Sequence, residues 1–237
     1  METILHRASE RGRGDHGWLS TRYSFSFADW YDPTKMGFGA LRVLNDDTIA
    51  PASGFPFHGH RNMEIITIVT RGVLTHQDNL GNIGTVRAGD VQVMSAGSGI
   101  IHTEYNASQD EPLSLFQIWI ETKEKGITPG YAQHSFAEIK REDGIVPLVG
   151  PVGGPDPLSI HQDAYIARTL LDSSHPREYQ LHTPHHGLYV FILEGSVDTA
   201  GHQLLSRDAL GVYNTATVAL TSPSKADVLL IEIPRAE

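Results

Sequence analysis

Two pairs of residues in this chain have the types and the spacing of metal ligands. His58 and His60 are separated by one residue, and so are His102 and Glu104. Alternate side chains of a β-strand point to the same face, so each pair would present two ligands to one interior. Three imidazoles and a carboxylate, with positions left open, form a donor set that catalytic sites use for a divalent metal. We therefore predict one metal held by these four residues.

Glycines flank both pairs and allow the backbone to bend tightly beside them. Gly54 precedes the first pair, and Gly97 and Gly99 precede the second. One histidine alone is more often structural than a ligand, but two such pairs in similar surroundings favour a metal site. If the strand of the first pair continued unbroken, Glu64 would face the same interior as the histidines.

Two further histidine-rich segments are interpreted as structural. The segment His76-Gln77-Asp78 stands at a predicted strand end before a turn, so we expect it in the barrel wall rather than among the ligands. The segment His182–His186 is not answered by a second His-x-Glu pair, and Pro184 interrupts its strand alternation. We expect three exposed loop residues there, His182, His185 and His186.

Composition narrows the class of protein. The 237 residues are 40% hydrophobic and 19% charged, as in ordinary soluble globular proteins, and can bury a sizeable core without staples. The absence of cysteine excludes disulfides, thiolate ligands and a cysteine nucleophile. A formal net charge of −10 argues against direct binding to nucleic acid. Because no long apolar segment or signal-like leader is present, we expect a cytoplasmic protein that does not enter membranes.

Short runs of alternating apolar residues, each closed by turn residues, recur along the whole chain and are typical of a β-sandwich or barrel. The strands predicted in the first half are 40–44, 64–69, 73–77, 91–94 and 113–120. Those predicted in the second half are 164–170, 188–193, 196–199, 216–220 and 228–233. Asn45-Asp46-Asp47 is expected to end the first of these strands as a turn.

The two halves of the chain resemble each other. Residues 64–73 and 188–197 are both apolar runs followed by a charged residue, a glycine and a second strand. This echo predicts a duplicated barrel module, with domains at 1–134 and 135–237. The turn-rich segment 150–157 is expected to be a linker between the halves. The capping-box spacing at 135–138 predicts a short helix.

A small basic cluster stands near the N-terminus. It consists of Arg7, Arg11 and Arg13, and Glu10 and Asp15 partly offset its charge. Glycines within the segment suggest flexibility. We expect a solvated arm.

The metal motifs and the segments around them are similar to those of the pirin family, within the cupin superfamily. The similarity is carried by Phe25-Ser26-Phe27, Tyr31-Asp32-Pro33, Met36-Gly37-Phe38, Leu41-Arg42-Val43, Asn45-Asp46-Asp47, Met63-Glu64-Ile65, His76-Gln77-Asp78, Met94-Ser95-Ala96-Gly97-Ser98-Gly99-Ile100, His102-Thr103-Glu104-Tyr105-Asn106 and Gln117-Ile118-Trp119. It is dense from Arg7 to Tyr131 and looser beyond.

This resemblance implies an all-β bicupin, in which two jelly-roll β-barrel domains face each other. It implies that the N-terminal domain holds the metal through the residues that match the family's ligands, His58, His60, His102 and Glu104. The C-terminal domain would be a degenerate cupin without a metal. Glu64, at a position that supplies a ligand in many other cupins, would lie outside the coordination sphere and could orient a ligand imidazole.

The resemblance also implies an activity. Some pirins are similar in activity to the cupin quercetinases, so we expect an oxidoreductase, a dioxygenase that cleaves a flavonol such as quercetin with O2. Glu104 would accept the proton of the substrate hydroxyl. Fe(II) is the favoured metal, and Ni, Cu, Co, Mn and Zn also suit the donor set. A mostly apolar barrel mouth would suit a flat aromatic ligand.

Two other functions fit the same four ligands. The first alternative is a metal-binding regulatory module that docks on a partner protein without turnover, as some pirins do. The second is a different small-molecule oxygenase or isomerase on the same scaffold, because a fold does not fix a function. Ligand identity does not separate these possibilities, and the lining of the pocket becomes the informative feature.

Overall fold

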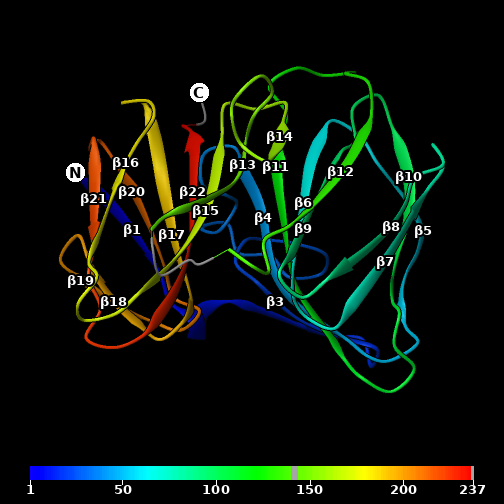
Figure 1. The fold of residues 1–237 in the computed structure, drawn as a ribbon, viewed down its shortest axis with the longest axis horizontal. Coiled ribbons are helices and arrows are strands. Elements are labelled where there is room, and N and C mark those ends of the chain that lie inside the picture. Colours follow the sequence, from blue (N-terminus) through cyan, green and yellow to red (C-terminus); the bar gives the residue numbers. More distant parts are fainter. Residues whose placement is uncertain (140–143, 236–237) are drawn as a thin grey trace.

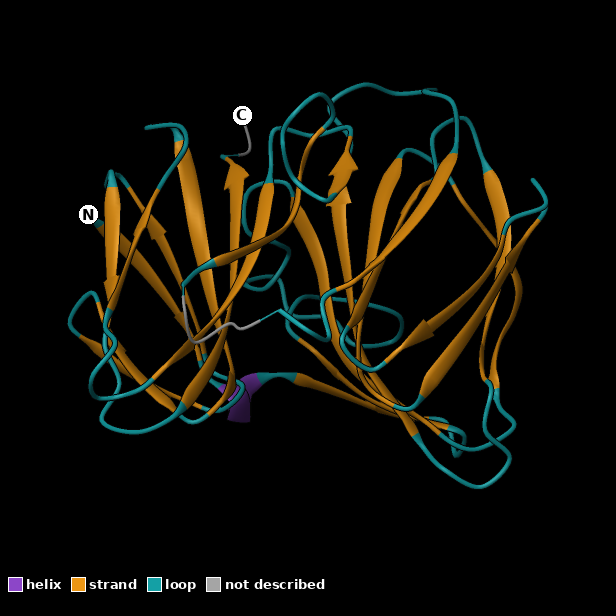
Figure 2. Cartoon of the chain, in the orientation of Figure 1, coloured by secondary structure: helices purple, strands orange, loops and turns teal. Residues whose placement is uncertain are grey.

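The computed structural model describes residues 1–139 and 144–235. The chain forms two lobes that lie side by side, one built from β2 to β12 and the other mainly from the later strands (Figure 1). Almost all regular structure is β-strand, and the one helix of the described part is a 3-10 turn at Ala8–Glu10 (Figure 2). The predicted all-β architecture of two jelly-roll domains is confirmed, although each is assembled from separate sheets rather than one closed ring.

The N-terminal lobe is a sandwich of two sheets. Its seven-stranded sheet has the order β12-β9-β6-β11-β4-β3-β2. These strands are β2 Gly12–Asp15, β3 Leu19–Tyr23, β4 Leu41–Ile49, β6 Met63–Arg71, β9 Asp90–Ser95, β11 Leu113–Glu121 and β12 Gly130–Ser135. The four-stranded sheet has the order β5-β10-β7-β8. Its strands are β5 Gly54–His60, β7 Val73–Asp78, β8 Ile83–Arg87 and β10 Ile100–Asn106.

The C-terminal lobe has a second seven-stranded sheet, of order β1-β20-β17-β22-β15-β13-β14, and two short two-stranded sheets, β16-β21 and β18-β19. The large sheet contains β1 Glu2–His6, β13 Val146–Pro151, β14 Leu158–Ile160, β15 Tyr165–Leu171, β17 His186–Glu194, β20 Ala209–Tyr213 and β22 Ala226–Pro234. The short sheets contain β16 Arg177–Gln180, β18 Ser196–Thr199, β19 His202–Leu205 and β21 Thr217–Leu220.

The largest hydrophobic core joins the two lobes. It combines buried side chains of both seven-stranded sheets, and the rings of Phe116 and Phe191 meet there edge to face, with centroids 5.7 Å apart. Because β6 and β17 have apolar neighbours on both faces, their sequences read as continuous hydrophobic runs rather than as alternation. This shared core fixes the N-terminal sheet that forms one wall of the site.

The predicted echo between the halves has a structural counterpart at two turns. Gly72 follows β6 with a φ of +82°, and Gly195 follows β17 with a φ of +85°. A Cβ atom at Gly195 would also meet the backbone oxygen of Lys225 at 2.4 Å. Both turns therefore need glycine for its left-handed conformation.

The N-terminal segment is not the solvated arm that its composition predicted. β1 pairs with β20 of the C-terminal sheet, so the segment straps the two lobes together. Arg7 forms a 2.7 Å ion pair with Asp208. Arg11 is only 7% exposed and its guanidinium donates to the backbone oxygen of Arg22 at 2.9 Å. Strand pairing with β20 and the contacts of Arg7 and Arg11 order this segment, although its glycines favour flexibility.

Three local predictions were also wrong. Residues 136–138 form a turn, with Ile139 N–H donating to the Phe136 oxygen, rather than a helix; residues 140–143 lie outside the described part. The expected linker at 150–157 connects β13 to β14 within the C-terminal lobe. Asn45-Asp46-Asp47 lies inside β4 instead of ending it. The boundary between the domains near Ser135, where β12 ends, stays a prediction.

Candidate metal centre

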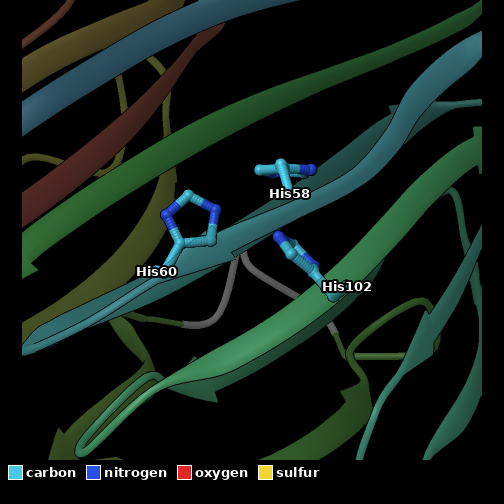
Figure 3. A group of neighbouring side chains, drawn as sticks. All are labelled: His58, His60 and His102. Atoms are coloured by element: carbon cyan, nitrogen blue, oxygen red, sulfur yellow. The ribbon is translucent and has the colours of Figure 1, made fainter.

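Three of the four predicted ligands converge between neighbouring strands. His58 and His60 project from β5, and His102 projects from β10, where it is paired with His58 across the ladder. Nitrogen atoms of the three imidazoles lie within 4.8 Å of one another. Figure 3 shows the rings turned toward a common space between the two strands. The i, i+2 spacing of the first pair therefore does place both imidazoles on one face.

The protonation of these histidines suits metal binding. His58 Nδ1 donates to the carbonyl oxygen of Pro56 at 2.8 Å, which leaves the Nε2 lone pair available. Burial, with the charges of neighbouring histidines, lowers the pKa of His60 to about 4 and that of His102 to about 2. Nε2 of His102 is buried and has no hydrogen-bond partner in the described chain. Neutral imidazoles with unused lone pairs are what a divalent metal requires, so the donor set fits one.

Glu104 is buried, as His102 is. Its carboxylate accepts hydrogen bonds from Gln117 Nε2 at 2.6 Å, from Thr67 Oγ1 at 3.3 Å and from Gln92 Nε2. Burial raises its pKa to about 7, against the lowering effect of these donors. Its oxygens group with His76 and His102 rather than with the histidine trio. The role of Glu104 as a metal ligand therefore stays a prediction. A lone pair of the carboxylate that accepts no hydrogen bond would bind the metal.

His76 and Asp78 have a larger place in the site than the sequence suggested. Both side chains are completely buried, with His76 Nε2 3.3 Å from Asp78 Oδ2. Nδ1 of His76 lies 3.4 Å from Nδ1 of His102. His76 is in the barrel wall, as predicted, but it faces His102 of the histidine trio. The signal was available, because His76 and Asp78 have the same i, i+2 spacing as the ligand pairs.

A pocket opens beside the histidines. Its walls are mainly aromatic and aliphatic, and they consist of Leu19, Tyr23, Phe27, Phe55, Ile65 and Trp119. The Trp119 ring meets the His60 ring edge to face at 4.9 Å, and Phe27 meets Trp119 in the same way at 5.3 Å. A flat aromatic molecule would thus be guided by rings that also hold a candidate ligand in position.

The floor of the pocket is polar and rich in hydrogen-bond acceptors. Oδ1 of Asn45, Oδ1 of Asp47 and Oε1 of Gln117 are buried without partners in the described chain. Burial raises the pKa of Asp47 to about 7. Sequence reasoning missed this floor because it treated Asn45-Asp46-Asp47 as a turn. Within β4 the alternation instead directs Asn45 and Asp47 into the pocket, while Asp46 pairs with Arg207 at 2.7 Å.

Glu64 does not reach the ligands, contrary to the prediction that it would orient one of them. Asn62, with a φ of +51°, separates β5 from β6, so strand parity is not carried across. The next residue, Ile65, lines the pocket, whereas Glu64 is fully buried and accepts a 2.6 Å hydrogen bond from Ser95. Because the strand is interrupted at Asn62, alternation counted from His58 and His60 predicted the wrong face for Glu64.

The histidines of the C-terminal lobe form a closed cluster. His182 and His185 are exposed, as predicted, but His186 is buried in β17, which corrects its placement on a loop. Nδ1 of His182 and Nδ1 of His186 both donate to the buried carboxylate of Glu232, at 2.8 and 2.9 Å. Tyr179 adds a third side-chain donor at 2.9 Å. Within the described residues, this cluster is not among the groups of side chains that could hold a metal.

The fold and the histidine cluster together define a two-domain cupin with a candidate metal centre in its N-terminal jelly roll. The family model for pirin matches residues 5–120. A model described as the quercetinase C-terminal cupin domain matches residues 148–233.

Relatives cover the chain from end to end. It is 40% identical over 230 residues to the quercetin 2,3-dioxygenase of Escherichia coli K12, which covers 97% of this chain and 98% of that protein. It is 45% identical to a pirin-like protein of Caulobacter vibrioides, over 93% of this chain and 95% of that one. The crystal structure of the bacterial pirin YhhW of Escherichia coli in complex with nickel(II) superimposes with a TM-score of 0.92, at 39% identity, over 99% and 100% of the two chains. This chain belongs to the pirin family.

No helix in the described part of the chain has the length and apolar character needed to span a membrane. The predicted relation to pirins and cupins is thus confirmed at the level of the family, and the activity requires a separate argument.

Proposed function

We propose that this protein is a metal-dependent dioxygenase that opens the ring of a flavonol, such as quercetin, with O2. The observation that carries the proposal is the meeting of three clustered histidine donors with an aromatic-walled pocket. The Escherichia coli relative at 40% identity is named a quercetin 2,3-dioxygenase, which supports the same class of reaction. Fe(II) and Ni(II) are the metals to test first, because the imidazoles suit both and a similar pirin forms a nickel(II) complex.

The bound metal would supply Lewis-acid activation of a substrate oxygen and a template for O2. Three imidazoles, His58, His60 and His102, would hold it. The remaining work falls to the protein's own groups. Trp119 and Phe27 would flank the substrate ring, and their apolar surfaces would exclude water from it.

Glu104 is the proposed proton acceptor. It lies in the same pocket as the histidines, and burial raises its pKa to about 7, close to the value that suits a general base at neutral pH. The amides of Gln92 and Gln117 hold its carboxylate in place. We propose that this carboxylate takes the proton of the flavonol 3-hydroxyl as that oxygen approaches the metal.

The polar floor supports a substrate that carries hydroxyl groups. Unpartnered acceptors on Asn45, Asp47 and Gln117 would each match the O–H of a phenol. An unsubstituted aromatic ligand would leave them unsatisfied at a cost of about 1–3 kcal/mol each. Polyhydroxylated flavonols are therefore better matched to this pocket than plain aromatic rings are.

Turnover of quercetin by Fe(II)-loaded and Ni(II)-loaded protein tests the proposal, with and without O2. We expect oxygen-dependent loss of flavonol absorbance, and no reaction with luteolin, the matched compound that lacks only the 3-hydroxyl. Equal inertness toward both compounds in the presence of either metal would refute flavonol cleavage. Binding of a protein partner in that case would point to the regulatory alternative.

A further inference from the structure

Three hydrogen-bonding groups stand in series beside the histidine trio. Nδ1 of His102 lies 3.4 Å from Nδ1 of His76, and Nε2 of His76 lies 3.3 Å from Oδ2 of Asp78. The side chains of His76 and Asp78 have no exposed surface. The ring of Tyr131 stacks on His76 with centroids 4.5 Å apart and covers it. The series is therefore closed to bulk solvent.

The carboxylate of Asp78 is held in one orientation. Backbone N–H groups of Leu80 and Asn82 donate to its Oδ1 at 2.9 and 3.0 Å. The side-chain amide of Asn82 donates to its Oδ2 at 2.8 Å. The turn after β7 thus fixes which oxygen faces His76.

The direction of each hydrogen bond follows from this fixed carboxylate. An ionised carboxylate only accepts, so His76 donates from Nε2 and keeps a lone pair on Nδ1. Between the two facing Nδ1 atoms one must donate, and His102 is the ring left to do so. The Nδ1–H tautomer of His102 leaves a lone pair on Nε2, the buried atom that has no partner in the described chain.

We propose that Asp78 and His76 are positioning residues that fix the metal-ready tautomer of His102. Outer hydrogen bonds of this kind orient ligand imidazoles and raise metal affinity about 10–100-fold. The inference rests on the proposed metal site for its purpose. The tautomer itself belongs to the metal-free protein and can be measured there.

Asp78→Asn is the decisive variant. The backbone N–H groups of Leu80 and Asn82 require an oxygen at the Oδ1 position, so the new amide nitrogen would occupy the Oδ2 position. It would donate one N–H to His76 and the other to the Asn82 side-chain amide, which would turn its oxygen inward. His76 would then donate from Nδ1 to His102, which would have to carry its proton on Nε2. That proton must leave before a metal binds.

Two measurements read this change. Long-range proton–nitrogen NMR spectra of ¹⁵N-histidine-labelled, metal-free protein distinguish the tautomers directly. We expect His102 in the Nδ1–H form in the native chain and in the Nε2–H form in Asp78→Asn. Competition of Ni(II) between the protein and a chelator should show affinity about 10–100-fold lower in the variant.

Asp90→Asn is the matched control, since Asp90 also holds a turn of the same lobe by accepting the Arg87 N–H at 2.7 Å. It changes the charge equally and should leave both the His102 tautomer and nickel affinity unchanged. Should Asp78→Asn fail to fold, His76→Leu serves instead and should give mixed His102 tautomers.

An unchanged His102 tautomer in Asp78→Asn or in His76→Leu would overturn the inference, and so would equal losses of nickel affinity in Asp78→Asn and Asp90→Asn. If the native protein binds no metal, the proposed function fails, while the NMR spectra still decide the tautomer relay.

Discussion

Both lobes of the protein place histidines beside a buried glutamate, but they use the imidazoles in opposite ways. In the C-terminal lobe, His182 and His186 direct Nδ1 at Glu232, which also accepts from Tyr179. In the N-terminal lobe, three imidazoles face one another, and Nε2 of His102 has no partner in the described chain. The difference teaches that a metal site depends on unused lone pairs rather than on the number of histidines.

The interiors of the two lobes also differ in how completely apolar side chains fill them. A continuous apolar cluster that includes Leu188, Val190 and Leu230 fills the C-terminal jelly roll. Apart from the core that it shares with the other lobe, the N-terminal jelly roll has two smaller apolar clusters, around Leu74 and around Met94. The pocket with its acceptor-rich floor lies in this lobe. The C-terminal lobe is thus packed with apolar side chains, whereas the N-terminal lobe holds the pocket.

Removal of the central ligand should have the largest effect. We expect His102→Ala to lower Ni(II) affinity more than about 100-fold, beyond the range that supporting residues cost. The matched variant His186→Ala in the other lobe should keep full metal content and lose about 2 kcal/mol of unfolding free energy. Metal analysis after gel filtration, with denaturant titration, measures both. Full metal retention in His102→Ala would contradict the assignment of the site.

The two buried glutamates should respond differently to the same substitution. Glu232→Gln places an amide N–H against imidazole or backbone donors and should cost about 3 kcal/mol of unfolding free energy. Glu104→Gln should cost less than about 1 kcal/mol, because the Gln117 amide can rotate and offer its unpartnered Oε1. We expect it instead to lower Ni(II) affinity at least about 10-fold. Equal losses of unfolding free energy in both variants would contradict the different roles assigned to Glu232 and Glu104.

The buried Asp47 should make the N-terminal lobe sensitive to pH. Its pKa rises from 3.8 in the unfolded chain to about 7 in the fold, because burial disfavours the charged carboxylate. The stabilising effect of the protonated form is complete below about pH 4 and is lost as pH rises through about 7. Metal-free Asp47→Asn should therefore exceed the native chain in unfolding free energy by about 2 kcal/mol at pH 8.

Near pH 4 the two proteins should be alike, and the exposed variant Asp110→Asn should follow the native chain throughout. Urea titrations between pH 4 and 8 measure the difference. A constant difference across that range would show that Asp47 is ionised in the fold.

The strap between the lobes should show the smallest effect. Arg7 is 41% exposed in its ion pair with Asp208, and exposed pairs contribute less than about 1 kcal/mol. A double-mutant cycle of Arg7→Ala and Asp208→Ala measures this coupling. A coupling above about 2 kcal/mol would contradict the small contribution expected of an exposed pair.

Spacing along the chain was sufficient to predict the main strands and the histidines that the fold brings together. Strand alternation placed His58 and His60 on one face, and the apolar runs located β6, β11, β17 and β22. These features depend on contacts along a single strand, which short-range spacing encodes directly.

Only the tertiary structure decided which polar groups meet. Asn45 and Asp47 face a pocket because β3 and β11 pair with β4 and extend it through residues that prefer turns. The bend at Asn62 sets the face on which Glu64 lies, and the pairing of β17 with β22 sets the position of His186. His76 reaches His102 because β7 and β10 pair in one register. Local spacing does not show which strands far apart in the chain will pair. Which histidine lone pairs stay without a hydrogen bond is therefore set only when the sheets assemble.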